Sequence, residues 1–374
     1  MQVLKLAPVL HYFDTVKEWN DAFPINNYDL VVTNEWLYKP YLEPLGITSN
    51  VIFQEKYGMG EPSDEMIDAI VRDAKEFRYD TIVAFGGGTI LDICKILALD
   101  VPTRSEDIFM GKAPPTKVKR LVVAPTTCGT GSEVTNVAIA ELKKLGIKRG
   151  IAVEETYPDK AVLIPETLKG LPYKVFVTSS IDALIHGIES YLSPKASEFT
   201  EAYARVAIKN IMSGYKDIVK RGEDARFDHL KEFMIASTFA GVSFGNAGCG
   251  AVHALAYSIG GAFHVPHGEA NYQFFPSVMK YYAKKNPEGK LRPLTAILAD
   301  TLGVDSTDVA KVYEELDAFL SQLIERKPLR EYGMTVDQIN EFAKITFENQ
   351  QRLLANNYVP TDEDDLRAIF EELY

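Results

Sequence analysis

The feature that most constrains the fold is a change of hydrophobic pattern about halfway along the chain. Before residue 172, short runs of apolar, β-branched residues alternate with helical patterns; the runs are residues 29–33, 50–54, 80–88, 120–127 and 160–165. Such runs predict a parallel sheet covered by helices on both faces. After Tyr173 only helical patterns follow, at residues 177–192, 198–219, 226–244, 251–260, 306–325 and 336–349, with a terminal helix in the acidic tail. We therefore predict an α/β domain at residues 1–172 and an all-α domain at residues 173–374.

The amino-acid composition limits the kinds of molecule that the protein could bind. The 374 residues carry a net charge of -12, which argues against nucleic acid and anionic membranes as partners and leaves a small-molecule substrate. No apolar run approaches the ~20 residues that a membrane span needs. The three cysteines are widely spaced and do not suggest a disulfide framework. We expect a cytoplasmic protein.

Two loops follow predicted strands and are rich in glycine or hydroxyl side chains. Gly86, Gly87 and Gly88 end the run at residues 80–88 and precede a helical pattern. The second loop reads PTTCGTGSE at residues 125–133. Glycine lets a ligand approach the backbone, and a helix N-terminus offers unpaired N–H groups to a phosphate. Either loop alone also fits an ordinary strand–turn–helix, but together they predict nucleotide binding at the carboxyl ends of two strands. Neither has the P-loop pattern.

Four side chains suggest a metal site. Asp182 and His186 are four residues apart in a helical pattern and so share one helix face, and His253 and His267 follow downstream, on either side of a glycine pair that we interpret as a break. One carboxylate and three imidazoles suit a divalent transition metal. From spacing alone, an Asp–His pair is more often a local hydrogen bond than a metal site, and His229 is interpreted as a surface residue.

Five motifs in this order, GGGT..D, PTTCGTGSEV, DALIHGIESY, VHALAYSIGG and VPHG, resemble those of the iron-containing (group III) alcohol dehydrogenases over essentially the whole chain. The resemblance implies an N-terminal dinucleotide-binding domain, a C-terminal helical domain, an active site in the cleft between them, and a homodimer. It implies Fe²⁺ held by Asp182, His186, His253 and His267, although Zn²⁺ suits the same ligands. The segment at residues 248–272 is most similar to members that interconvert 4-hydroxybutyrate and succinate semialdehyde with NAD.

The resemblance also assigns the cofactor-binding residues. The expected set is Asn34, Gly86, Gly87, Gly88, Thr89, Asp92, Thr126, Thr127, Thr130, Ser132 and Lys148. His264, Lys148 or Arg149 could meet the substrate carboxylate.

The chain departs from the family pattern at two positions. Many relatives have a second histidine four residues after the one at His253, where this chain has Tyr257. Proton relay would then fall to Tyr257 or to His264. Several NAD-dependent relatives have an aspartate where this chain has Asn34, which can bind a ribose hydroxyl without a charge. This favours NAD and leaves NADP open.

Three alternatives remain at this stage. The first is a dehydrogenase of the same family that acts on another small alcohol or a diol, with NAD or NADP. The second is a metal-dependent lyase of similar build, as in dehydroquinate synthase. The third is a nucleotide-binding protein that has lost catalysis, against which the four intact candidate ligands argue.

Overall fold

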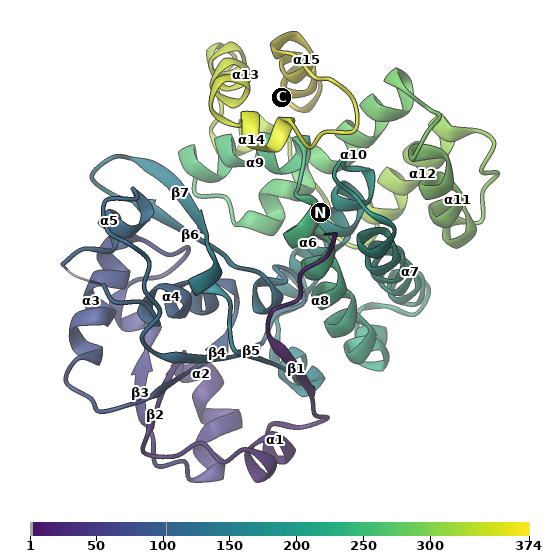
Figure 1. Ribbon diagram of the computed structural model, residues 1–374. Coiled ribbons are helices and arrows are strands. Elements are labelled where there is room, and N and C mark those ends of the chain that lie inside the picture. Colours follow the sequence, from purple (N-terminus) through teal and green to yellow (C-terminus); the bar gives the residue numbers. More distant parts are fainter. Residues whose placement is uncertain (1–2, 102) are drawn as a thin grey trace. The chain divides into compact units, whose positions relative to one another are not determined.

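The protein is described from a computed structural model that covers residues 3–101 and 103–374. Its chain divides into two compact units (Figure 1). The α/β unit comprises residues 6–171, and the helical unit comprises residues 172–374 together with residues 3–5. Residues 3–5 join the helical unit because Asn246 bonds both backbone groups of Lys5, accepting from its N–H at 2.6 Å and donating to its carbonyl at 2.9 Å.

A six-stranded parallel sheet forms the centre of the α/β unit, with strand order β1-β8-β5-β4-β2-β3. The strands are β1 (Val9–Tyr12), β2 (Asp29–Thr33), β3 (Asn50–Phe53), β4 (Thr81–Gly86), β5 (Arg120–Pro125) and β8 (Lys160–Leu163). All five predicted strands are present. Sequence analysis missed β1, a four-residue edge strand with exposed residues at both ends, because so short a run has no clear alternation.

Each face of the sheet has its own apolar core, as expected when helices cover both sides. One core packs α3 (Asp64–Ala74), α4 (Gly88–Leu97) and α5 (Ser105–Phe109) against the sheet. The other packs α1 (Val16–Ala22) and residues 37–47 against the opposite face. Ser63 caps α3, since its Oγ accepts from the N–H of Met66 at 3.2 Å.

A hairpin absent from the prediction interrupts the α/β order. The antiparallel strands β6 (Val137–Leu142) and β7 (Ile147–Ala152) form it. The turn is confined to residues 143–146, where Gly146 has φ +63°, and Lys148 and Arg149 lie within β7.

The helical unit contains α6 (Tyr173–Leu192), α7 (Glu198–Arg221), α8 (Leu230–Ala247), α9 (Ala251–Ala262), α10 (His267–Lys285), α11 (Leu291–Leu302), α12 (Val309–Ser321), α13 (Asp337–Asn349), α14 (Gln351–Leu354) and α15 (Glu363–Leu373). Sequence analysis missed α10 and α11. The predicted break at Gly260 and Gly261 is wrong, because α9 continues through both glycines. The chain turns at residues 263–266 instead, where His264 has φ +52°.

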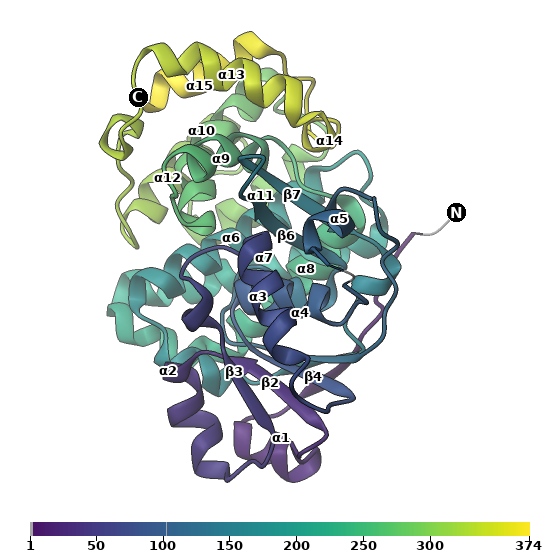
Figure 2. The same ribbon diagram turned by 90° about the vertical axis from the view of Figure 1, so that its left-hand side faces the viewer.

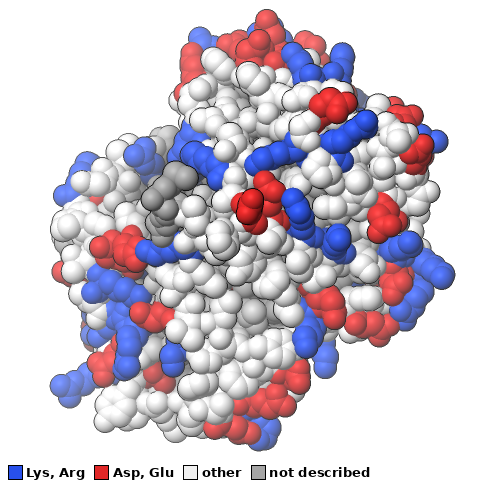
Figure 3. Space-filling view, turned by 45° about the vertical axis from the view of Figure 1, so that its right-hand side comes forward, with Lys and Arg blue, Asp and Glu red and all other residues white. Residues whose placement is uncertain are grey.

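The centre of the helical unit is α6, which is buried over most of its length between α7, α8 and α10. The last helices, α13 and α15, lie side by side, and α15 also packs on α10 (Figure 2). On the face in Figure 3, acidic and basic side chains are interspersed among uncharged ones. No helix within the described part of the chain combines the length and the apolarity that crossing a membrane would take.

Candidate active site

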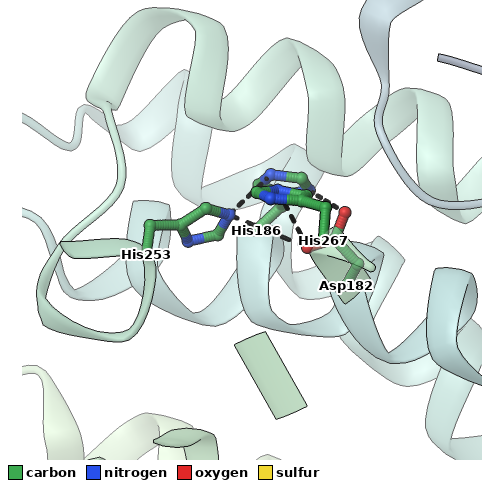
Figure 4. Close-up of side chains that lie close together, drawn as sticks. All are labelled: Asp182, His186, His253 and His267. Atoms are coloured by element: carbon green, nitrogen blue, oxygen red, sulfur yellow. Dashed lines mark hydrogen bonds and ion pairs between the residues drawn. The ribbon is translucent and has the colours of Figure 1, made fainter. Parts of the chain in front are cut away.

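The helical unit brings together the four predicted metal ligands (Figure 4). Asp182 and His186 come from the middle of α6, His253 from the first turn of α9, and His267 is the first residue of α10. One potential ligand atom from each side chain lies within 4.8 Å of all the others. The side chains of Asp182, His186 and His253 are nearly inaccessible to solvent, whereas that of His267 is 38% exposed. The cluster therefore opens on the side of His267.

The distances suit one small cation. Nε2 of His186 and Nε2 of His253 are 3.0 Å apart, and Oδ1 of Asp182 lies 3.7 Å from Nε2 of both His253 and His267. A four-coordinate ion with bonds of about 2.0–2.2 Å separates its ligand atoms by roughly 3.4 Å. The residues present thus fit a divalent metal by donor type and by spacing.

Electrostatics in the cluster favour an ionised Asp182. Burial by itself would raise the pKa of this carboxyl, but the imidazoles of His186, His267 and His253 and the amide of Asn271 outweigh it, and the pKa is lowered. Asn271, on α10, donates to Oδ1 of Asp182 at 2.7 Å. A carboxylate held in its charged form is the state that binds a metal.

Glu189 is a buried residue that sequence analysis missed. Its Oε2 lies 2.6 Å from Nδ1 of His253, and its Oε1 accepts from the N–H of Val252 at 2.7 Å. The carboxylate therefore fixes both the first turn of α9 and the Nδ1 edge of the imidazole. The pKa of His253 is raised, since Cys249 and Glu189 together outweigh the opposing effect of burial. With Nδ1–H donated to Glu189, Nε2 is left as the ligand atom. A signal existed, because Glu189 stands three residues after His186 on the same helix face.

The two other residues considered for catalysis lie outside this cluster. Tyr257, one turn after His253 on α9, is partly buried and packs against Cys249, Ala254 and Leu353. His264 is exposed in the loop between α9 and α10. His229, interpreted as a surface residue, lies before α8 and bonds Asp217 through Nε2 at 2.9 Å. The proposed roles of Tyr257 and His264 stay predictions.

In the α/β unit, the two predicted cofactor loops touch each other. A Cβ added at Gly88 would lie 2.7 Å from Cγ2 of Thr130, and one added at Gly87 would lie 3.2 Å from Cγ2 of Thr127. Thr126 donates its N–H to the carbonyl of Gly86 at 3.0 Å. The glycines are thus required for close packing between the loops.

The N-terminus of α4 suits an anion. No side chain within the described residues caps this helix, which begins at Gly88 with Gly87 as the N-cap residue. Thr89, in its first turn, donates from Oγ1 to the carbonyl of Gly60 at 3.1 Å. Backbone N–H groups at such a terminus, with the helix dipole behind them, bind phosphate groups.

Asp92 and Ser132 belong to an internal network. Ser132 donates from Oγ to Oδ1 of Asp92 at 2.7 Å, and the N–H of Ile139 donates to Oδ2 at 3.0 Å. The fully buried Lys95 donates to Ser132 Oγ and to the carbonyl of Val137, both at 2.6 Å. Burial lowers the pKa of Lys95 to about 8, against the opposing pull of Asp92 and Glu133. The network ties α4 to the second loop, so Asp92 and Ser132 shape the loop from within.

The other two predicted cofactor residues lie at the edges of this unit. Asn34 directly follows β2, is 7% exposed, and precedes the short helix α2 (Glu35–Leu37). Its Nδ2 donates to Oε1 of Gln54 at 3.1 Å and to Oε2 of Glu55 at 3.0 Å. Lys148, on β7, pairs with Glu61 at 2.5 Å.

The fold and the site together define a class: a protein with a dinucleotide-type sheet and glycine loops in one unit and an aspartate–histidine metal cluster in the other. The model of the Fe-containing alcohol dehydrogenase family, C-terminal, matches residues 176–374, and the model of iron-containing alcohol dehydrogenase matches residues 16–165. The chain therefore belongs to the iron-containing alcohol dehydrogenase family, as its motifs predicted.

Individual relatives agree with this assignment. The chain is 50% identical to a 4-hydroxybutyrate dehydrogenase of Clostridium kluyveri over 374 residues, which is 100% of both chains. It is 31% identical to a sulfoacetaldehyde reductase of Bilophila wadsworthia over 83% of this chain and 81% of the relative. The crystal structure of a sulfoacetaldehyde reductase from Bifidobacterium kashiwanohense in complex with NAD+ superimposes with a TM-score of 0.83 at 22% identity, over 100% of this chain and 98% of that one. This last similarity establishes the fold.

Proposed function

We propose that this enzyme oxidises 4-hydroxybutyrate reversibly to succinate semialdehyde, with NAD as the hydride acceptor and Fe²⁺ as the bound metal. The observation that carries the proposal is the 50% identity with the Clostridium kluyveri 4-hydroxybutyrate dehydrogenase across the full length of both chains. Fe²⁺ is preferred over Zn²⁺ because the matching family models are those of iron-containing enzymes.

In this proposal Asp182, His186, His253 and His267 hold the metal. When bound, the metal supplies Lewis acidity, which lowers the pKa of an alcohol hydroxyl and polarises a carbonyl. The chain's own contribution is to fix the ligands before the metal arrives. Asn271 orients the Asp182 carboxylate, and the ring of Phe244 stacks on His186 at 4.1 Å between ring centroids. Rigid ligands of this kind bind without a large ordering cost.

The α/β unit would bind the dinucleotide, and the helical unit the metal and the alcohol, so we propose residues 1–172 and 173–374 as the two functional domains. The N-terminus of α4 and the loop that contains Thr126, Thr127 and Thr130 would hold the pyrophosphate and the nicotinamide end. NAD, when bound, supplies the acceptor for the hydride from the carbinol carbon. We keep Lys148 as a candidate for contact with the nicotinamide ribose.

Proton transfer and substrate binding have named candidates that substitution can separate. Tyr257 and His264 are the candidates for moving the alcohol proton, and loss of either group should alter the pH dependence of kcat. His264, Lys148 and Arg149 are the candidates for the substrate carboxylate, and their replacement should raise KM for 4-hydroxybutyrate more than for a neutral alcohol of the same length.

Two properties of the whole molecule belong to the proposal. We propose a homodimer, which light scattering coupled to gel filtration would test. We also propose a cytoplasmic location. The three cysteines, all buried and outside any disulfide, are compatible with a reducing compartment.

The deciding experiment follows NADH absorbance with 4-hydroxybutyrate and NAD, on protein reconstituted anaerobically with Fe²⁺. His267→Ala should abolish turnover and weaken metal binding. The matched control is His229→Ala, in the same unit and outside the ligand cluster, which should leave both unchanged. A panel of other small alcohols and diols, each with NAD and NADP, accompanies the assay. Turnover of a neutral diol without turnover of 4-hydroxybutyrate would keep the family and reject the proposed substrate.

A further inference from the structure

An acidic side chain from the segment that follows β3 lies at the carboxyl end of β2. Oε2 of Glu55 accepts from Nδ2 of Asn34 at 3.0 Å, and Oε1 accepts from the backbone N–H of Glu35 at 2.8 Å. Glu55 follows β3, which pairs in parallel with β2. Both of its oxygens are thus directed to the first residues after β2, and the carboxylate is held there by two hydrogen bonds.

The orientation of the Asn34 amide is set by its surroundings. Gln54 donates from Nε2 to the carbonyl of Gly58 at 2.8 Å, so its Oε1 must be the atom that faces Asn34. Both hydrogens of Asn34 Nδ2 are then used, by Gln54 and by Glu55. A carboxylate at position 34 would face two acceptor oxygens and be repelled. The neutral amide at position 34 and the acid at position 55 therefore form a matched pair.

The carboxyl end of β2 lies next to the predicted pyrophosphate-binding loop. β2 pairs with β4, whose end carries the glycine loop before α4. In doubly wound sheets, an acidic side chain at the end of the second strand receives the ribose 2′-hydroxyl of NAD and disfavours the 2′-phosphate of NADP. In this chain Asn34 occupies that strand end and brings no charge. Glu55 supplies a carboxylate at the same place, and each of its oxygens has a further lone pair with which to accept a hydroxyl.

The neighbouring acid does not offer an equivalent charge. Glu35 forms an ion pair with Lys39 at 3.0 Å, and its side chain is 54% exposed. For Glu55, no ion pair is present among residues 3–101 and 103–374. The nearby Lys56 lies instead over the ring of Phe53, 5.0 Å from its centroid. The uncompensated charge at this strand end therefore belongs to Glu55.

We propose that Glu55 is the specificity-determining residue for the dinucleotide, taking the place of an acid on β2 by presenting its carboxylate to the adenosine ribose. This inference rests on the proposed NAD-dependent function. Removing the charge while keeping the shape should admit the 2′-phosphate, and the loss of one charge–charge repulsion across a partly solvated site corresponds to a change on the order of tenfold in affinity.

The test measures binding of NAD and NADP by calorimetry, without alcohol or added metal, so that it is independent of turnover. Glu55→Gln keeps a carbonyl oxygen for Asn34 but gives up the acceptor for the backbone N–H of Glu35. It should tighten NADP binding about tenfold or more relative to NAD binding. Glu35→Gln, which removes the neighbouring charge, should keep the wild-type ratio of NAD to NADP affinities. Asn34→Asp combined with Glu55→Gln moves the charge to the residue after β2, where the new amide at position 55 can donate to it while Oε1 of Gln54 still opposes it. This variant should regain part of the preference for NAD.

The possible outcomes distinguish failure of the proposed role of Glu55 from failure of the proposed NAD-dependent function. Equal binding of NAD and NADP by the wild type would overturn the role of Glu55 and leave the dehydrogenase function standing. The same conclusion follows if Glu55→Gln, shown by circular dichroism to be folded, leaves NADP binding unchanged, or if Glu35→Gln has an equal effect. Failure of the wild type to bind either dinucleotide would overturn the proposed function, and the inference with it.

Discussion

The fully buried Lys95 should give the α/β unit a pH-dependent stability. Its ammonium group lies in the interior of the unit, where it donates to Ser132 and to a backbone carbonyl, with Oδ1 of Asp92 3.7 Å away. Burial penalises the charged form and lowers the pKa from 10.5 to about 8. Lys95→Met keeps most of the side-chain length and removes the ionisable group, so the comparison isolates its titration.

The sign follows from which state holds the proton. Between pH 8 and 10.5 the unfolded chain keeps the lysine protonated while the folded chain has released the proton, so stability rises with pH across this window. Below pH 8 the lysine is charged in both states, so burial of the charged Lys95 lowers the free energy of unfolding by its full amount. At 1.36 kcal/mol per pH unit, the difference between 10.5 and about 8 corresponds to about 3 kcal/mol. The free energy of unfolding of the wild type, minus that of Lys95→Met, should rise by about this amount.

Tryptophan fluorescence makes the assay specific to this unit. Trp19 and Trp36 are the two tryptophans of the chain, both lie in the α/β unit, and Trp19 is 2% exposed. Urea unfolding followed by fluorescence at several pH values gives the difference in free energy of unfolding between the wild type and Lys95→Met. Lys17→Met, at a side chain that is 71% exposed, reports the pH dependence of the same replacement in solvent. A difference between wild type and Lys95→Met that stays flat, or falls with pH, would refute the reasoning.

Three further predictions concern the helical unit. Glu189→Gln should weaken Co²⁺ or Zn²⁺ binding to chelator-treated protein by about 10–100-fold, because the imidazole of His253 loses its charged partner; unchanged affinity by calorimetry would contradict the orienting role. Gly268→Ala should destabilise the helical unit by about 1–3 kcal/mol, since the added Cβ would lie 2.4 Å from the carbonyl oxygen of Thr178. Urea unfolding followed by circular dichroism measures it, and wild-type stability would show that α10 can yield there. Chelation should lower the thermal midpoint of the wild type and leave that of Asp182→Asn unmoved, because a bound ion stabilises only a chain that can hold it; equal shifts in both would place the ion elsewhere.

Much of the fold was predictable because its signals are local. Apolar β-branched runs predicted five parallel strands, and the 3.6-residue period of a helix was enough to predict that Asp182 and His186 share one face. Where local signals were short or ambiguous, prediction failed. The four-residue β1 and the hairpin of β6 and β7 were missed, and a glycine pair inside α9 was interpreted as a break.

The site shows the same division between local and distant information. The family resemblance named His253 and His267 as ligands, but their approach to Asp182 depends on how three helices pack, and His253 lies 67 residues from His186 along the chain. Hydrophobic periodicity and residue spacing show which side chains are neighbours on one helix or strand. They do not show which helices or strands lie close to each other. The partners of these residues were therefore visible only in the tertiary structure, as with Glu189 behind His253.

The sequence by itself determined which chemical groups are present: two loops suited to phosphate, one aspartate and three histidines suited to a metal, and an asparagine where an acid was expected. Only the tertiary structure decided what these groups meet. It brought Glu55 to Asn34 across two neighbouring strands, and it buried Lys95 of α4 against the second loop and β6. The physical reason is that hydrogen bonds and burial act over a few ångströms in space, whatever the separation of the residues along the chain.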